Sequence, residues 1–222
     1  DGKVFRSYLG VGMQDLTPEL AREFDARSDR GALVGEIWPN TPAAEAGIKP
    51  GDIITEINGR KINDSRGLRL IVALTPPGTK STLKLLRGGK EMTVEVTVRE
   101  MPKKGMQPPT SRDRPPAPRP ESTGGLLRGI EVANLDSRWR DQFEIPPHIQ
   151  GALVMNVDTG SPAYAAGLRP GDVIMEINRQ PVRNSQEAVA LSRDAENGEK
   201  VLLRVWSNGG TGFVVWEPLR NR

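Results

Sequence analysis

The sequence contains no cysteine and only one histidine among its 222 residues. Without cysteine the chain can form no disulfide bond, thiolate nucleophile or zinc–sulfur site. A single imidazole, His148, cannot assemble a histidine-rich metal centre. A Ser-His-Asp triad would also have to use His148, which follows two prolines in a chain that shows no nucleophile motif. We therefore interpret His148 as a surface-loop residue, and we expect no catalytic centre, metal or cofactor in these residues.

Long apolar runs are also missing, since none approaches the roughly 20 residues that cross a bilayer. Hydrophobic residues make up 36% of the chain and charged residues 27%. This composition suits two small domains of about 100 residues better than one large core. The N-terminus is not a charged-then-apolar leader, so we expect a mature protein or a piece of a longer one.

The net charge of +3 is concentrated in residues 101–123, which hold five basic residues, two acidic residues and seven prolines. Such a segment cannot bury enough apolar surface to fold, and we expect an extended, semi-rigid tether. A nucleic-acid-binding protein should instead carry a basic face on a folded domain, so we expect no nucleic-acid partner. Two alternatives remain for the segment: a proline-rich ligand for an aromatic groove, and docking on anionic lipid or nucleic acid that is appreciable only at low salt.

An internal repeat is the strongest feature of the sequence. Residues 31–58 and 151–178 are identical at 15 of 28 positions at a fixed offset of 120. Both contain Gly-Ala-Leu-Val, a turn, and then Pro-Ala-x-x-Ala-Gly followed by Pro-Gly-Asp and Glu-Ile-Asn. Chance does not produce this agreement, so the chain contains a duplicated domain. We place the first domain at residues 1–100, the linker at 101–123 and the second domain at 124–222.

Short apolar runs between Gly, Pro and Asn turns predict mainly strands with two or three short helices in each copy. In the first copy we expect strands over residues 32–38, 53–58, 82–86 and 92–98, and helices over 42–46 and 65–74. Thr17 and Asp136 are the expected N-caps of one further short helix in each copy. In the second copy, residues 201–206 and 212–216 predict a hairpin that turns at residues 207–210.

The first copy opens with alternating apolar residues around a glycine, in the segment Arg6-Ser7-Tyr8-Leu9-Gly10-Val11-Gly12-Met13. With the repeat that follows, this segment resembles a PDZ domain. The resemblance implies a mainly β fold with short helices, as two PDZ-like, partly open β-barrel domains in tandem. It also implies a loop whose backbone N–H groups bind a peptide carboxylate, beside a strand edge to which the peptide adds.

The resemblance carries the peptide-binding role onto particular residues of the first copy. The loop and the strand after it would contribute Tyr8, Leu9, Gly10, Val11 and Met13. The helix at residues 65–74 would form the opposite wall with Leu68 and Val72, although core packing is an equally good reading of these two. An apolar groove of this kind favours an apolar C-terminal residue in the ligand.

The second copy departs from this pattern. Its corresponding residues are Leu127, Arg128, Gly129, Ile130 and Val132, so a charged residue replaces Leu9. On its helix, Ala188 and Ser192 replace Leu68 and Val72. We expect this groove to prefer another ligand or to bind none, and the first copy to be the better receptor.

The first 60 residues resemble more specifically the junction of HtrA/Do (Deg) envelope serine proteases, where a trypsin-like domain ends and the first of two PDZ domains begins. The resemblance implies a protease domain before Asp1, with residues 1–6 as its tail, a periplasmic location and an oligomeric parent. The implied partners are C-terminal or unfolded polypeptide segments, the chain's own protease domain and other subunits. The covered residues would then be the regulatory, substrate-recognition region of an enzyme that maintains envelope protein quality.

Other readings of the repeat are a free-standing tandem PDZ scaffold and the periplasmic PDZ pair of a membrane-embedded protease. The nucleophile motif of the HtrA/Do family, Gly-Asn-Ser-Gly-Gly, does not occur in the chain. Residues 207–210 resemble it only in composition, and their position between two apolar runs predicts a hairpin turn.

Overall fold

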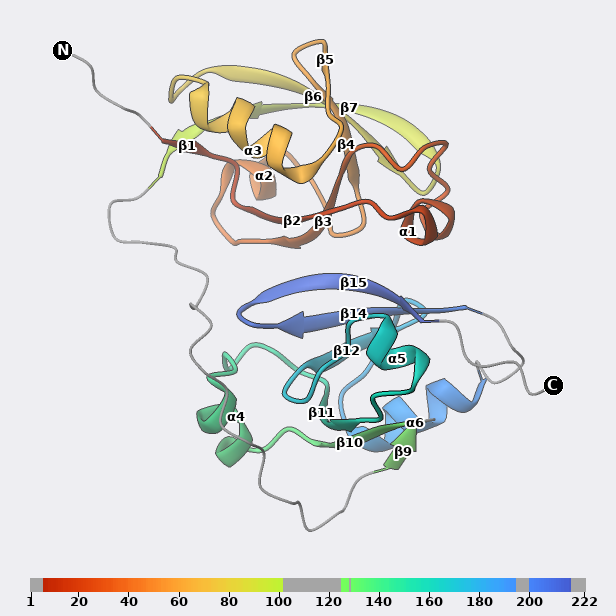
Figure 1. Cartoon of the computed structure of the whole chain (residues 1–222). Helices are drawn as coiled ribbons and strands as arrows, with labels where there is room; N and C mark the ends of the chain where they lie inside the picture. Colours follow the sequence, from red (N-terminus) through yellow and green to blue (C-terminus); the bar gives the residue numbers. More distant parts are fainter. Residues whose placement is uncertain (1–5, 102–124, 128, 195–199, 217–222) are drawn as a thin grey trace. The chain divides into compact units, whose positions relative to one another are not determined.

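The computed structural model describes residues 6–101, 125–127, 129–194 and 200–216. The chain divides into two compact units, Asp1–Gln107 and Pro108–Arg222, each with its own apolar core (Figure 1). The expected fold class is confirmed: the described residues form mainly strands with short helices, and neither large sheet closes into a barrel. Residues 1–5 and 102–124, which include almost all of the predicted linker, lie outside the described residues.

The first unit contains eight strands and three helices among its described residues. In chain order these are β1 (Ser7–Tyr8), β2 (Val11–Asp15), α1 (Pro18–Glu23), β3 (Ala32–Ile37), α2 (Pro42–Glu45), β4 (Ile53–Ile57), β5 (Arg60–Lys61), α3 (Ser65–Leu74), β6 (Lys80–Arg87), β7 (Lys90–Thr97) and β8 (Arg99–Glu100). The main sheet has the order β2-β3-β4-β6-β7, while β1 and β8 pair separately. Strand β2 is therefore an end strand of the main sheet.

The second unit repeats this arrangement with one difference at its edge. Its elements are β9 (Gly125–Leu127), β10 (Ile130–Asn134), α4 (Ser137–Phe143), β11 (Ala152–Val157), α5 (Pro162–Ala165), β12 (Val173–Ile177), β13 (Gln180–Pro181), α6 (Ser185–Asp194), β14 (Val201–Ser207) and β15 (Gly210–Trp216). The sheet has the order β15-β14-β12-β11-β10-β9, so β9 continues it beyond β10.

Local sequence explains where the helices begin. The Thr17 hydroxyl accepts a hydrogen bond from the Leu20 N–H at 3.3 Å, and Pro18 occupies the first helical position of α1. The Asp136 carboxylate caps α4 by accepting from the Trp139 N–H at 2.9 Å. Both predicted N-caps are confirmed, and the predicted helix at residues 65–74 matches the bounds of α3.

The two units share their strand register as well as their order. Val11 lies opposite Ile37 in β2 and β3, and Ile130 lies opposite Val157 in β10 and β11. One residue further along, both pairs shift register at a β-bulge. The sequence repeat therefore corresponds to a repeat of backbone geometry, including an irregularity that alternation of apolar residues alone does not predict.

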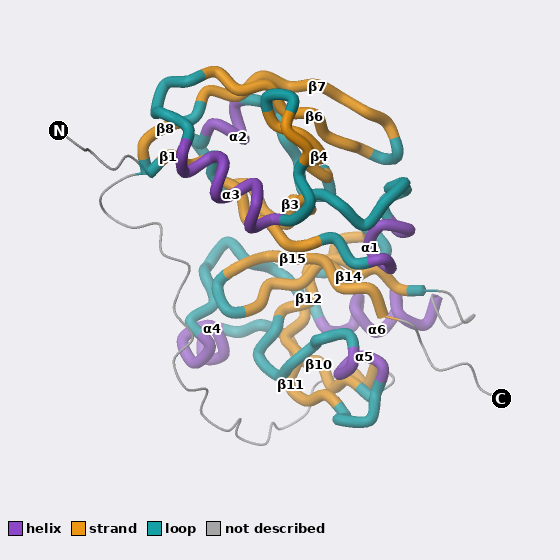
Figure 2. Tube along the Cα trace, turned by 45° about the horizontal axis from the view of Figure 1, so that its top comes forward, coloured by secondary structure: helices purple, strands orange, loops and turns teal. Residues whose placement is uncertain are grey.

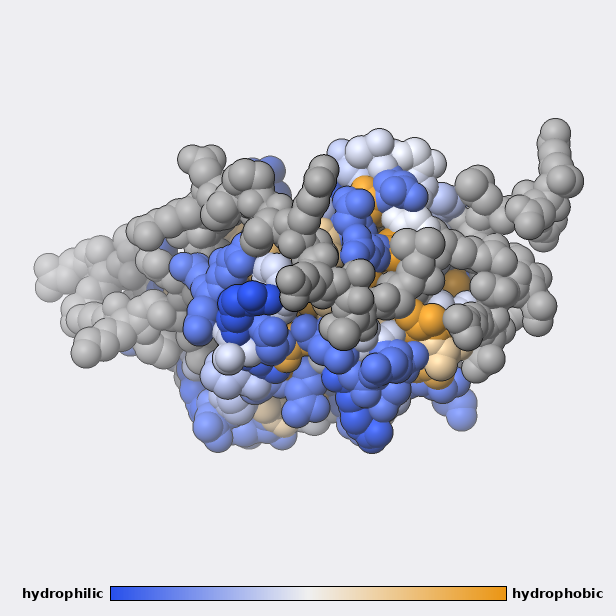
Figure 3. Space-filling view, turned by 90° about the horizontal axis from the view of Figure 1, so that it is seen from below, coloured by the Kyte–Doolittle hydropathy of each residue, from blue (hydrophilic) through white to orange (hydrophobic). Residues whose placement is uncertain are grey.

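The hairpin predicted at residues 207–210 is confirmed. Ser207 pairs with Gly210, and Asn208 and Gly209 both have positive φ, as a two-residue turn requires. His148 lies exposed in a loop, as expected. Among the described helices, none is long and apolar enough to cross a membrane. The described residues that are visible in Figure 3 are mostly hydrophilic, with apolar atoms in small separate areas.

Candidate peptide-binding site

The predicted loop lies between β1 and β2 and consists of Leu9 and Gly10. Gly10 has a φ of +81°, a backbone conformation that side chains with a Cβ rarely adopt. A Cβ added to Gly10 would also fall 2.2 Å from the Cβ of Thr41. Two independent reasons therefore require glycine at this position.

Thr41 is the residue that holds the loop in place, and the sequence analysis missed it. It is fully buried at the N-cap of α2, and its hydroxyl donates to the Trp38 carbonyl at 2.7 Å and lies 3.4 Å from the Gly10 carbonyl oxygen. The hydroxyl residue in front of Pro-Ala-x-x-Ala-Gly recurs in both copies, where the second has Ser161. This recurrence was the signal that could have identified it.

Both carbonyl oxygens of the loop accept hydrogen bonds within the domain, whereas two of its N–H groups have no acceptor among the described residues. The Trp38 N–H donates to the Gly10 carbonyl at 3.0 Å, and the Ala43 N–H donates to the Leu9 carbonyl at 2.9 Å. In the part of the chain that the structure describes, no acceptor is found for the N–H groups of Leu9 and Gly10. Successive free N–H groups in a glycine loop can bind an anion such as a carboxylate.

The loop continues directly into β2, the end strand of the main sheet, which lies beside helix α3. Within the described residues no strand pairs with the outer edge of β2. Helix α3 lies against β1, β2 and β3, and Figure 2 shows it running beside this part of the sheet. An exposed strand edge of this kind is a template for an added strand.

The apolar residues predicted to line the groove meet in one cluster. Leu9, Val11, Leu68 and Val72 all belong to the core of the first unit and are at most 8% exposed. Met13 is partly buried against the same cluster, and Tyr8, also half-buried, pairs with Arg99 in β8. Core packing is thus an observed role of Leu68 and Val72, and their contact with a ligand stays a prediction that requires the cluster to open.

The far end of this edge is fixed to α3 by Asp15. Its carboxylate accepts from the Ser65 hydroxyl at 2.6 Å and from the Ser65 N–H at 2.9 Å. These two hydrogen bonds hold the pKa of Asp15 below its ordinary value. In the second unit the Asn134 amide oxygen accepts the same two bonds from Ser185, each at 2.9 Å.

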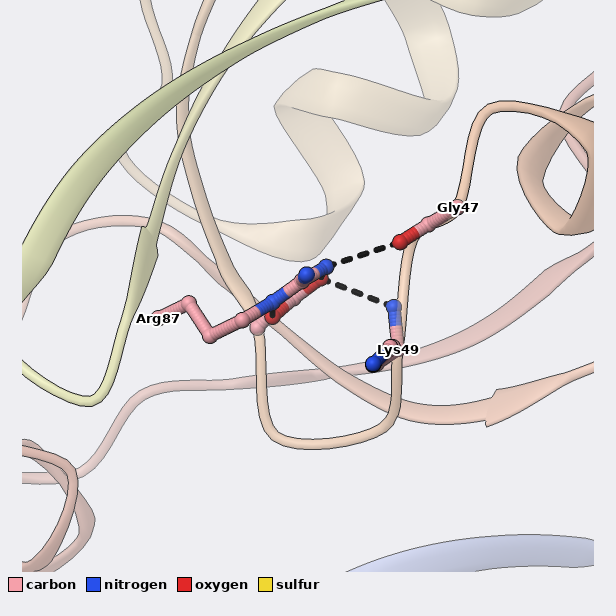
Figure 4. Close-up of polar contacts among 4 residues, drawn as sticks. Gly47, Lys49 and Arg87 are labelled. Carbon is pink, nitrogen blue, oxygen red and sulfur yellow. Dashed lines mark hydrogen bonds and ion pairs between the residues drawn. The ribbon is translucent and has the colours of Figure 1, made fainter.

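The turn beside α2 is held by an ion pair between a buried carboxylate and a partly exposed guanidinium group (Figure 4). Asp52 is 1% exposed and accepts from two nitrogens of Arg87, each at 2.7 Å, and from the Lys49 N–H at 2.8 Å. Arg87 also donates to the Gly47 carbonyl at 2.8 Å, and the hydrogen bonds to Asp52 raise its pKa. In the second unit the corresponding Asp172 accepts from Ser207 at 2.7 Å.

The second unit keeps the glycine loop. Gly129 has a φ of +83°, and its added Cβ would lie 3.0 Å from the Cβ of Ser161. Ile130 and Val132 are fully buried, as is Ala188 on α6, while Ser192 is half-buried. Arg128 lies outside the described residues, so the structure leaves open its predicted effect on the groove.

In the second unit the edge that corresponds to β2 is covered. Strand β9 pairs antiparallel with β10, with Leu127 opposite Ile130 and Gly125 opposite Val132. In the first unit the corresponding strand, β1, pairs instead with β8.

Among the described residues, no group of three or more His, Cys, Asp or Glu side chains could hold a metal ion in either unit.

Comparisons with known proteins identify the family of the two units. Two PDZ domain family models match the chain, at residues 7–98 and 153–207, and together they cover more than half of it. The periplasmic serine endoprotease DegP of Escherichia coli K12 is 36% identical over 186 residues, which are 84% of this chain and 34% of the relative. A probable DegP-like periplasmic serine endoprotease of Chlamydia pneumoniae is 32% identical over 98% of this chain and 41% of its own length.

A solved structure of the HtrA-type protease AlgW with a decapeptide is 36% identical, with a TM-score of 0.42, over 46% of this chain and 31% of that one. The chain spans well under half the length of these curated relatives. Its own described residues form two units of one architecture, each with a glycine loop, a β-bulge and a helix beside the sheet. The chain belongs to the PDZ domain family, which it contains twice, and its relatives are serine endoproteases of the HtrA/DegP type.

Proposed function

We propose that this chain is the peptide-binding, substrate-recognition and regulatory region of a periplasmic serine endoprotease of the HtrA/Do type. The observation that carries the proposal is the loop of Leu9 and Gly10, whose N–H groups have no acceptor among the described residues and adjoin the edge of β2 with which no described strand pairs. A peptide's terminal carboxylate would accept from these N–H groups, while its backbone adds to β2 as a further strand.

The chemistry of the loop selects the end of a polypeptide. No charged side chain is needed, because the oriented backbone dipoles provide the positive potential. The apolar cluster beneath the loop, with Leu9, Val11, Leu68 and Val72, would receive an apolar final side chain. C-termini of this kind are exposed in unfolded or damaged proteins, which supports a role in protein quality control.

The relatives support the wider context. Their names describe periplasmic serine endoproteases, and this chain aligns with a part of each that is well under half. Cleavage would belong to a protease domain of the parent protein, with which these modules communicate, and the parent would be an oligomer. We expect no nucleic-acid partner and at most weak contact with membranes.

The proposal is tested by titrating the full chain with a short peptide that ends in an apolar residue. We expect a dissociation constant of about micromolar or weaker, because one added strand buries little surface. The matched control is the same peptide with an amidated C-terminus, which should bind at least about tenfold more weakly. Equal affinity of the two peptides would show that the loop does not receive a carboxylate.

A further inference from the structure

The two units differ most where peptide binding is proposed. In the first unit the chain before the glycine loop turns away from β2, since β1 pairs with β8. In the second unit the equivalent segment folds back onto β10 as strand β9. Figure 1 shows β9 beside β10 and near α6, and β9 and α6 are in contact. The edge that is open in one unit is thus occupied in the other.

The geometry of β9 is that of an added peptide. It pairs antiparallel with β10 and runs toward the glycine loop, so that its last residue, Leu127, lies opposite Ile130. Ile130 corresponds in register to Val11, the first residue of β2 after Gly10. A ligand that adds to β2 with its C-terminus in the loop would run in the same direction and end at the same level.

The remainder of the second site is built as in the first. Gly129 keeps the positive φ of Gly10, Ser161 lies under it as Thr41 does under Gly10, and Asn134 is joined to Ser185 at the far end. We propose that the second groove is a peptide receptor that holds the chain's own residues 125–127, and that external peptides bind only when β9 detaches. This inference rests on the proposed function, because it assigns the same ligand class to both grooves.

The energetic balance favours the state in which β9 occupies the second groove, but it still allows β9 to detach. Only two residues separate Leu127 from Ile130, so β9 competes at an effective concentration of about millimolar or higher. A three-residue strand held by one edge is nevertheless weak, and short hairpins are marginally stable in water. The apparent affinity of an external peptide is therefore its intrinsic affinity multiplied by the fraction of molecules in which the groove is free.

The test follows the backbone amide signals of Gly10 and Gly129 by NMR in the full, isotope-labelled chain. The probe is a synthetic peptide that copies residues 122–127 and ends in a free carboxylate. Leu127→Pro removes a strand N–H and should release β9, whereas Leu127→Ala keeps the backbone donor and serves as the matched control. We expect the dissociation constant of the peptide, measured from the Gly129 signal, to be at least about tenfold lower in Leu127→Pro than in the control or the unchanged chain.

A reversible lock provides the opposite change. Leu126 and Glu131 are register partners, and the chain has no cysteine, so Leu126→Cys with Glu131→Cys can form one defined disulfide. Oxidation should abolish the response of Gly129 and reduction should restore it. Circular dichroism and thermal unfolding check that each variant is folded.

The unchanged chain gives an independent measurement if a variant does not fold. An Hα–Hα nuclear Overhauser effect between Leu126 and Glu131 should be present, and it should fade as millimolar peptide shifts Gly129. The proposal is overturned if the Leu126–Glu131 contact is absent in the unchanged chain. It is also overturned if the oxidised double-cysteine variant binds the peptide as well as Leu127→Pro does, or if the peptide does not shift the Gly129 signal in Leu127→Pro. A response of Gly129 without one of Gly10 would refute the proposed function of the first groove alone.

Discussion

Gly10 and Thr41 are 31 residues apart in sequence, yet the Cα of Gly10 packs directly against the Thr41 side chain. The threonine fills the space that a side chain at residue 10 would need, and its hydroxyl faces the Gly10 carbonyl. The shape of the loop is therefore maintained by the N-cap residue of α2.

Replacing Gly10 with alanine should impair both stability and peptide binding. The positive φ and the overlap with Thr41 together should cost about 2–4 kcal/mol in the free energy of unfolding, measured with urea. Gly47→Ala is the matched control, because Gly47 also has a positive φ but open space around its Cβ position. It should cost only about 1 kcal/mol and leave binding intact.

A double variant separates the two causes. Thr41→Gly removes the overlapping Cβ, so Gly10→Ala should cost less in that background than in the unchanged chain. The difference is the coupling between the two residues and should be at least about 1 kcal/mol. Strictly additive effects would mean that backbone strain alone demands glycine at residue 10.

The ion pair of Asp52 and Arg87 predicts unequal stability effects in the two units. Arg87→Ala leaves the buried Asp52 carboxylate with a single described donor, the Lys49 N–H, and should destabilise the first unit by about 2–4 kcal/mol. Ser207→Ala removes a neutral donor from Asp172 and should cost about 1–2 kcal/mol. Denaturant titrations of the two variants compare them directly, and a larger loss in Ser207→Ala would contradict this account.

Asp15 predicts a pH dependence at the far end of the groove. Since its pKa is lower in the folded chain than in the unfolded chain, its contribution to stability is fully present above the unfolded pKa. That contribution is lost as the pH falls through the folded pKa. A carboxyl-carbon NMR titration should find the Asp15 midpoint below that of an ordinary aspartate, and Ser65→Ala should raise it.

The variant Asp15→Asn separates the charge of Asp15 from its hydrogen bonds, because the second unit has an asparagine, Asn134, at the corresponding position. The amide oxygen can accept both bonds from Ser65, as that of Asn134 does from Ser185. We expect the variant to fold with nearly unchanged stability at neutral pH and to lose the pH dependence assigned to Asp15. A large loss of stability at pH 7 would show that the charge, more than the hydrogen bonds, holds the helix.

Helix α3 offers a comparison between a core residue and a surface residue of the same type. Leu68 is fully buried, whereas Leu70 is 60% exposed. Leu68→Ala should reduce the free energy of unfolding by about 2–5 kcal/mol, and Leu70→Ala should change it by about 0.5 kcal/mol or less. If Leu68 lines the groove as well, peptide affinity should fall in Leu68→Ala under conditions where that variant remains folded.

The repeat made the fold predictable, because two copies of one pattern show which residues the backbone requires. The helix at residues 65–74, the capping residues Thr17 and Asp136 and the turn at Asn208 and Gly209 all follow from local chemistry. The loop at Gly10 was predicted from the resemblance to PDZ domains, because a glycine between apolar residues is by itself equally typical of a bulge or a bend.

What the sequence did not reveal has three different causes. Thr41 contacts Gly10 although β2, α1 and β3 separate the two residues in sequence, and its motif shows only that it caps α2. The pairing of β9 with β10 was also hidden, since three residues after a proline-rich segment carry no strand pattern of their own. A residue such as Leu68 gives the same apolar signal whether it packs in a core or lines a groove.

The attachment of β9 has a mechanical consequence. Its N-terminal end, Gly125, is continuous with the chain that leads from the first unit, while its other end adjoins the glycine loop. Tension along that chain would act on β9 at the end far from the loop and would separate its pairs one at a time, first Gly125 from Val132 and last Leu127 from Ile130. A strand loaded in this way opens at much lower force than one sheared along its length, so movement at one end of the chain would be converted into access to a groove at the other.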